Sequence, residues 1–152
     1  MIADDVVQVF EGDKTGKAAI GHGYTYSGHP VGAAAALACL AETKRLKVNE
    51  NAAARGAELF SGLQALQDKY EMIGDVRGGH GLMCALELVS DRASKAPIGK
   101  GPIGTLQEVT YQNGAMVRVS GPNVILSPPL VLTSADVQTI LTALDAGFAA
   151  AS

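Results

Sequence analysis

Gly21-His22-Gly23-Tyr24-Thr25-Tyr26-Ser27-Gly28-His29-Pro30 is a glycine-rich loop with several hydroxyl groups, and it leads directly into the alanine-rich segment 31–40. Pro30 suits the first position of a helix, because its φ is already fixed and its missing N–H needs no partner there. The alanines have the highest helix propensity, so the sequence predicts a helix over residues 30–47. Hydroxyl groups and free backbone N–H groups at a helix start favour an anion such as a phosphate.

Composition places the chain among globular proteins. Its 152 residues are 47% hydrophobic and 18% charged, which is enough for one ordinary domain with a core. The net charge of −3 and the lack of a basic cluster argue against nucleic-acid binding. No apolar run reaches membrane-spanning length, and the first five residues contain two aspartates where a signal peptide would be basic, so we expect no membrane association and a cytoplasmic protein.

The cysteine and histidine residues do not indicate a metal site. Cys39 and Cys84 lie far apart between apolar neighbours, which predicts two buried thiols in a reducing compartment, with a disulfide or metal pair as the alternative. His22, His29 and His80 lack the mutual spacing of metal ligands, and His29 is expected to orient the loop. We therefore predict no metal.

Hydrophobic periodicity predicts alternating helices and strands after the loop. The expected elements are a helix over 52–70 capped by residues 49–51, strands over 73–78 and 82–89, a loop over 90–104, a helix over 105–112, strands over 116–119 and 124–126, and a helix to 149 capped by Thr133 and Asp136. Residues 1–10 are too short a pattern to separate helix from strand. The order predicts an α/β protein of α+β type, with helices over a mostly antiparallel sheet.

Several segments resemble one enzyme family. Residues 23–31 resemble the H-G-[YF]-T-Y-S-G-H-P-V segment of class III pyridoxal-phosphate aminotransferases, in particular the omega-amino acid–pyruvate branch. Residues 74–89 resemble its V-R-G-x-G-L-M…E-L signature, with one extra residue, and residues 114–133 resemble its G-x-x-[VL]-R…S-P-P-L…T pattern. The resemblance covers nearly the whole chain.

The resemblance implies a fold type I enzyme of which this chain is the C-terminal portion. Residues 1–48 would be the end of the large cofactor-binding domain with its long connecting helix, and residues 49–152 the small C-terminal α+β domain. The lysine that forms a Schiff base with the cofactor would lie upstream of Met1. Lys14 and Lys17 have no apolar company to lower their pKa, so we expect them to be solvated surface charges and the chain to contain no catalytic residue.

The resemblance also assigns cofactor-binding residues. It places Thr25 on the phosphate of pyridoxal 5'-phosphate in the other subunit of a homodimer with a shared active site, with the backbone of Tyr24 helping. The alternative for Thr25 is a loop hydroxyl that bonds its own backbone.

Arg118 is the candidate substrate-binding residue. It stands in the otherwise apolar segment 116–119, and its planar guanidinium suits a carboxylate in bidentate fashion. The alternative is an outward-facing residue of an edge strand. In the family that the chain resembles, the matching arginine binds the carboxylate of the substrate or keto acid. Arg77 is expected to be structural, and Glu87 receives no role.

We therefore expect a C-terminal fragment of a transaminase that moves an amino group between an amine or omega-amino acid and a keto acid such as pyruvate. The fragment is expected to be inactive alone and to associate through the apolar surface of its first long helix. The alternatives are an aminomutase or decarboxylase that shares the loop, and a non-enzymatic α+β association module that retains the fold.

Overall fold

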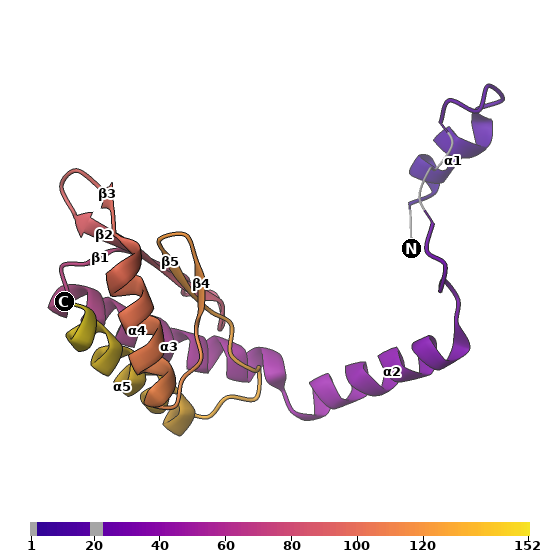
Figure 1. The fold of residues 1–152 in the computed structure, drawn as a ribbon. Helices are drawn as coiled ribbons and strands as arrows, with labels where there is room; N and C mark the ends of the chain where they lie inside the picture. The colour runs from indigo at the N-terminus through magenta and orange to yellow at the C-terminus, as the bar shows by residue number, and fades with distance from the viewer. Residues whose placement is uncertain (1–2, 19–22) are drawn as a thin grey trace. The chain divides into compact units, whose positions relative to one another are not determined.

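The computed structural model describes residues 3–18 and 23–152, which divide into two compact units, Met1–Leu40 and Ala41–Ser152 (Figure 1). The first unit contains helix α1 (Asp4–Gly12) and the larger part of helix α2 (Pro30–Arg45). The N-terminal segment is therefore a helix, and Asp4 and Asp5 in its first turn interact favourably with the helix dipole.

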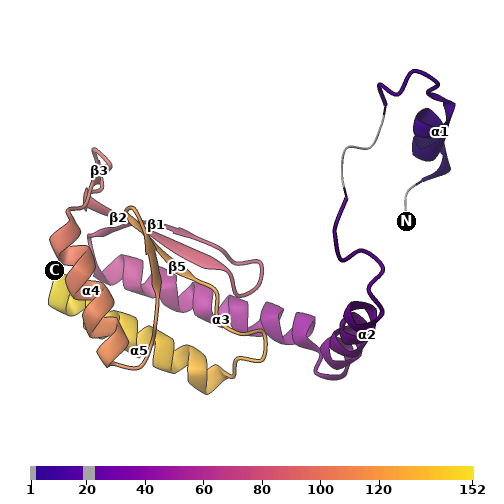
Figure 2. The ribbon, with the colours of Figure 1, turned by 45° about the vertical axis from the view of Figure 1, so that its right-hand side comes forward.

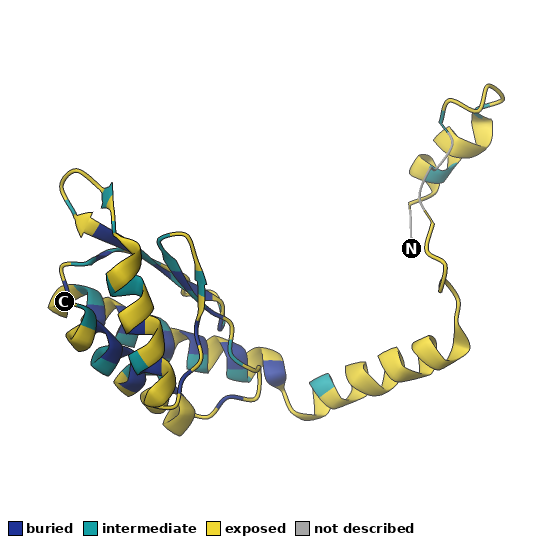
Figure 3. Cartoon of the chain, viewed as in Figure 1, coloured by how far each residue is buried: buried dark blue, intermediate teal, exposed yellow. Residues whose placement is uncertain are grey.

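Helix α2 begins at Pro30, as predicted, and ends two residues earlier than expected, at Arg45. None of its residues is buried (Figure 3). The prediction that Cys39 is a buried thiol is therefore wrong, because Cys39 is exposed on this helix. Cys84 is buried, as predicted.

Helix α3 (Val48–Lys69) opens the second unit. Its buried residues recur at helical spacing and face the core: Val48, Ala52, Gly56, Leu59, Leu63 and Leu66. The predicted cap at residues 49–51 is wrong, because the helix already begins at Val48, after Lys47 with a positive φ of 49°. The Asn51 amide instead donates hydrogen bonds of 2.9 Å to the backbone carbonyls of Leu130 and Leu132.

The sheet has the order β1-β2-β5-β4, and β3 pairs with β2. Its strands are β1 (Ile73–Arg77), β2 (Cys84–Asp91), β3 (Ala96–Pro97), β4 (Arg118–Ser120) and β5 (Asn123–Leu126). Every pairing in the described part is antiparallel, which confirms the predicted sheet type. The short strand β3 lies within the segment that was predicted to be a loop.

Two further helices complete the unit. Helix α4 (Lys100–Gln112) begins five residues before its predicted start, because Pro102 in a first helical turn costs no hydrogen bond. Helix α5 (Ser134–Ala151) carries the predicted capping box of Thr133 and Asp136. The two helices pack closely at Gly147, where a Cβ atom would lie only 2.2 Å from the Thr110 hydroxyl oxygen.

The core lies between one face of the sheet and helices α3, α4 and α5 (Figures 1 and 2). Leu59, Leu86, Leu106, Val124 and Phe148 are fully buried and come from five different elements. The other face of the sheet carries polar side chains and remains exposed or half-buried, and Arg118 belongs to that face.

Candidate functional site

The hydroxyl-rich loop consists of two consecutive turns. The Ser27 N–H donates to the Tyr24 carbonyl at 3.0 Å, and the His29 N–H donates to the Tyr26 carbonyl at 3.2 Å. Gly28 has a φ of 73°, a conformation that side-chain-bearing residues rarely adopt. The described part of the loop, residues 23–30, therefore leads into helix α2 through these two turns.

His29 caps that helix. Its Nδ1 accepts a hydrogen bond of 3.4 Å from the Gly32 N–H, which is an otherwise unpaired donor of the first turn. Its ring meets the Tyr26 ring edge-on, with centroids 6.2 Å apart and planes at 72°. Since Nδ1 is the acceptor, neutral His29 carries its proton on Nε2. These contacts confirm that His29 orients the loop, whereas His22 lies outside the described residues.

Thr25 and Tyr24 are both exposed in this loop. The Thr25 hydroxyl makes no hydrogen bond with any residue of the described ranges 3–18 and 23–152. The alternative in which it bonds its own backbone is thus not adopted, and the hydroxyl is available to a ligand. The cofactor roles of both residues stay predictions.

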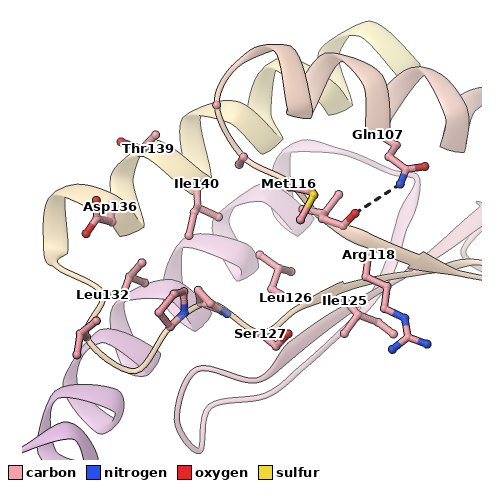
Figure 4. Close-up of a pocket in the computed structure, with 16 residues that line it drawn as sticks. Gln107, Met116, Arg118, Ile125, Leu126, Ser127, Leu132, Asp136, Thr139 and Ile140 are labelled. Atoms are coloured by element: carbon pink, nitrogen blue, oxygen red, sulfur yellow. Dashed lines mark hydrogen bonds between the residues drawn. The ribbon is translucent and has the colours of Figure 1, made fainter. Parts of the chain in front are cut away.

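A groove of about 820 Å³ lies in the second unit, beside strands β4 and β5 and the start of α5 (Figure 4). Its lining is mostly apolar and includes Met116, Leu126, Leu132 and Ile140. The segment 127–132 forms one wall, and the two hydrogen bonds of Asn51 described above hold that wall against α3.

Arg118 lies at the end of this groove. Its side chain points away from α4 and lies on the same side of the ribbon as Ile125, its cross-strand partner (Figure 4). Among the five arginines, all of which are described, it alone makes no hydrogen bond or ion pair with the described residues. The other four are paired as follows: Arg45 with Glu42, Arg55 with Glu58, Arg77 with Asp75 and Glu87, and Arg92 with Glu71 and four backbone carbonyls.

Arg77 lies on the same exposed face but is fully engaged. Its guanidinium contacts Glu87 at 2.5 Å and Asp75 at 3.2 Å, and donates to the Asn123 side-chain oxygen at 2.6 Å. The Glu87 carboxylate, as the main cause, raises the pKa of Arg77. This network confirms a structural role for Arg77 and gives Glu87 the partner that the sequence analysis did not assign. Strand alternation indicated that Asp75 and Arg77 share a face, whereas the register that brings Glu87 and Asn123 beside them emerged only from the structure.

The structure does not bring the predicted site residues into one described cluster. Tyr24 and Thr25 belong to the first unit and Arg118 to the second, and each unit is described by itself. Within the described ranges, no group of histidine, cysteine, aspartate or glutamate side chains could hold a metal ion. Burial raises the pKa of the Cys84 thiol, which makes it an inert core residue. None of the described helices combines the length and apolar character needed to cross a membrane.

A family model described as "Aminotransferase class-III" matches residues 2–148. The chain is 34% identical over 131 residues to the taurine–pyruvate aminotransferase of Bilophila wadsworthia, covering 82% of this chain and 28% of that protein. It is 36% identical over 123 residues to the putrescine–pyruvate aminotransferase of Pseudomonas aeruginosa, and the match covers 80% of this chain and 26% of that protein. The chain thus spans little more than a quarter of the length of these relatives.

Solved structures are similar over more of the chain. An amine transaminase from an uncultivated Pseudomonas species, in its PLP-bound form, is 40% identical with a TM-score of 0.87, covering 96% of this chain and 33% of that one. An (S)-enantioselective omega-transaminase from Thermomicrobium roseum is 31% identical with a TM-score of 0.83, and the match covers 99% of this chain and 33% of that one. The helices and antiparallel sheet described above are therefore similar in fold to one part of these solved transaminases.

Proposed function

Because this chain belongs to the class III aminotransferase family, we propose that the complete protein transfers an amino group between an amine or omega-amino acid and a keto acid such as pyruvate. Two of the relatives named above are pyruvate aminotransferases, which supports pyruvate as the acceptor. The observation that carries the proposal is the guanidinium of Arg118 at the end of an apolar groove, where it has no hydrogen-bond or ion-pair partner among the described residues.

Pyridoxal 5'-phosphate is the cofactor of this family, and when bound it supplies the electron sink for the reaction. The exposed hydroxyl of Thr25, which has no hydrogen-bond partner in the ranges 3–18 and 23–152, suits a phosphate oxygen as acceptor. A hydrogen bond from Thr25 to that dianion would be charge-assisted and worth roughly 1.5–3 kcal/mol. The backbone of Tyr24 would lie beside it. In our proposal both residues serve the partner subunit of a homodimer, so that each active site is shared.

Arg118 would bind and orient the carboxylate of the keto acid. Its fork of N–H donors matches the two carboxylate oxygens, and it has no partner among the described residues that such a ligand would have to displace. Apolar groove walls would exclude water and strengthen this ion pair, since a lower local dielectric increases the attraction between opposite charges.

We further propose that residues 1–48 are the end of the large cofactor-binding domain, that residues 49–152 are the small domain, and that the enzyme is cytoplasmic. The chain by itself would not transaminate, because neither Lys14 nor Lys17 is a candidate for the lysine that carries the cofactor. Borohydride treatment in the presence of cofactor, followed by peptide mass mapping, tests this: a reduced lysine adduct together with turnover of an amine donor would contradict it.

The carboxylate role is tested by Arg118→Ala in the complete enzyme. We expect the KM for pyruvate to rise by about 10-fold to 100-fold, because a charge-assisted interaction worth roughly 1.5–3 kcal/mol is lost. The KM for an amine donor without a carboxylate should change little. Arg45→Ala, which removes an exposed arginine paired with Glu42, is the matched control. Equal effects of Arg118→Ala on both substrates would refute the role.

A further inference from the structure

The exposed face of the sheet carries two arginines in one row across four strands. Arg77 pairs with Ala85, Ala85 with Ile125, and Ile125 with Arg118. Paired residues of antiparallel strands point to the same face, so both guanidinium groups lie on it. Their Cα atoms are separated by three strand spacings, roughly 14 Å.

Both arginines are exposed, and they differ in charge environment. The Arg77 side chain is 49% exposed, so solvent and small ligands reach it. Two carboxylates, Asp75 and Glu87, surround its single positive charge, which leaves a local net charge of −1. A carboxylate ligand that approached Arg77 would meet this negative cluster and would have to displace an existing partner.

Arg118 has the opposite environment. Its cross-strand partner is the apolar Ile125, and the neighbouring Ser120 on the same strand is uncharged. The carboxylate that lines the groove, that of Asp136, is already bound in the capping box with Thr133. The positive charge of Arg118 is therefore the one on this face that no carboxylate compensates among the described residues.

We propose that Asp75 and Glu87 are specificity-determining residues: they mask Arg77, so that the sheet face offers a single carboxylate site at Arg118. This inference rests on the proposed role of Arg118. A ligand with one carboxylate gains the full interaction, and a second carboxylate on the same ligand finds no partner at Arg77. Glu87 contributes most to this masking, because its carboxylate oxygen lies nearer to the Arg77 guanidinium than that of Asp75 does. The other terminal nitrogen of Arg77, Nη2, donates a hydrogen bond to the side-chain oxygen of Asn123.

Arginine modification resolved by residue tests the masking. The whole chain is treated with phenylglyoxal, and the rate at each of its five arginines is followed by peptide mass spectrometry. In the unaltered chain, Arg118 should react about threefold to fivefold faster than Arg77, although both are accessible. Glu87→Gln should raise the rate at Arg77 by about twofold to fivefold, the range expected for loss of one solvent-exposed ion pair.

Matched controls separate masking from unfolding. Glu108→Gln alters an exposed glutamate that contacts Gln112 on α4, and it should leave the Arg77 rate unchanged. Arg45, whose partner Glu42 is intact in every variant, serves as an internal reference, and circular dichroism monitors the fold. If Glu87→Gln does not fold, the comparison of Arg77 with Arg118 in the unaltered chain still decides the proposal.

Ligand protection distinguishes this inference from the function on which it rests. Pyruvate and glutarate should both slow modification at Arg118 and not at Arg77, and glutarate should begin to protect Arg77 in Glu87→Gln. Equal rates at Arg77 and Arg118 in the unaltered chain, or an unchanged Arg77 rate in folded Glu87→Gln, would overturn the masking. If neither ligand protects Arg118 while Arg77 is still released by Glu87→Gln, the proposed carboxylate role fails instead.

Discussion

The substitution of glycine by alanine should have opposite effects at two helical positions of this protein. A Cβ atom on Gly56, in α3, would lie 2.2 Å from the carbonyl oxygen of Gly81 and 2.4 Å from its carbonyl carbon. Those atoms are backbone and cannot rotate away. At Gly104, in α4, a Cβ atom would have nothing within 4 Å.

The magnitudes follow from two competing effects. Alanine in a helix interior gains up to about 1 kcal/mol over glycine, because glycine loses more backbone entropy on folding. Overpacking of a close contact costs about 1–3 kcal/mol, and the cost is at the high end where the neighbour is backbone. The loop that meets Gly56 is constrained, since Gly78, Gly79 and Gly81 all have positive φ. We therefore expect Gly56→Ala to destabilise the fold by about 1–2 kcal/mol and Gly104→Ala to stabilise it by about 0.5–1 kcal/mol.

Urea unfolding followed by circular dichroism, at a concentration low enough to limit association, measures both effects. The midpoint should fall for Gly56→Ala and rise for Gly104→Ala, with unchanged slopes. A midpoint that rises for Gly56→Ala, as it should for Gly104→Ala, would show that the close approach between α3 and the loop 78–81 does not exist in solution, and would refute the packing described above.

Substitutions at Arg92, at Asp136 and at the exposed leucines of α2 test other parts of the structure. Arg92→Ala should lower the free energy of unfolding by about 2–3 kcal/mol, because it leaves backbone carbonyls at the end of α3 and at the start of β1 without their charged donor. Arg92→Lys should restore part of this loss. If urea unfolding shows no loss for Arg92→Ala, these contacts are contradicted. A hydrogen bond from the Thr133 hydroxyl is the main cause that lowers the pKa of Asp136 in the folded chain. The contribution of the ionised Asp136 carboxylate to folding stability is therefore fully present above its unfolded pKa of about 3.9, and it is lost as the pH falls through the lower folded pKa. Stability measured against pH should thus fall less steeply in acid for Asp136→Asn than for the unaltered chain, and parallel curves would refute this. The double substitution Leu37→Glu and Leu40→Glu should reduce self-association of the chain, as measured by light scattering, because both leucines are exposed on α2. If the unaltered chain is already monomeric, the expected association is contradicted.

Local chemistry made much of this fold predictable. Pro30 marked the start of α2, and the spacing of Thr133 and Asp136 marked the start of α5, because a helix boundary is decided within one turn. The start of α4 was missed because Gly101 and Gly104 have low helix propensity, while packing against α5 stabilises the helix nonetheless.

Long-range contacts were not predictable from local patterns. Nothing near Asn51 in the sequence indicates that its side chain bonds a loop about 80 residues away, and its residue type instead suggested a cap. Cys39 was expected to be buried because its neighbours are apolar, but burial depends on what packs over a helix. Arg118 could be singled out from its apolar strand, whereas its lack of a partner within the described part of the chain emerged only from the structure.

The most direct test of the proposed function is a crystal structure of the complete gene product with pyridoxal 5'-phosphate bound. We predict that the Thr25 hydroxyl lies within hydrogen-bonding distance of a phosphate oxygen of the cofactor held by the partner subunit. A structure in which Thr25 lies remote from every cofactor phosphate would contradict the account.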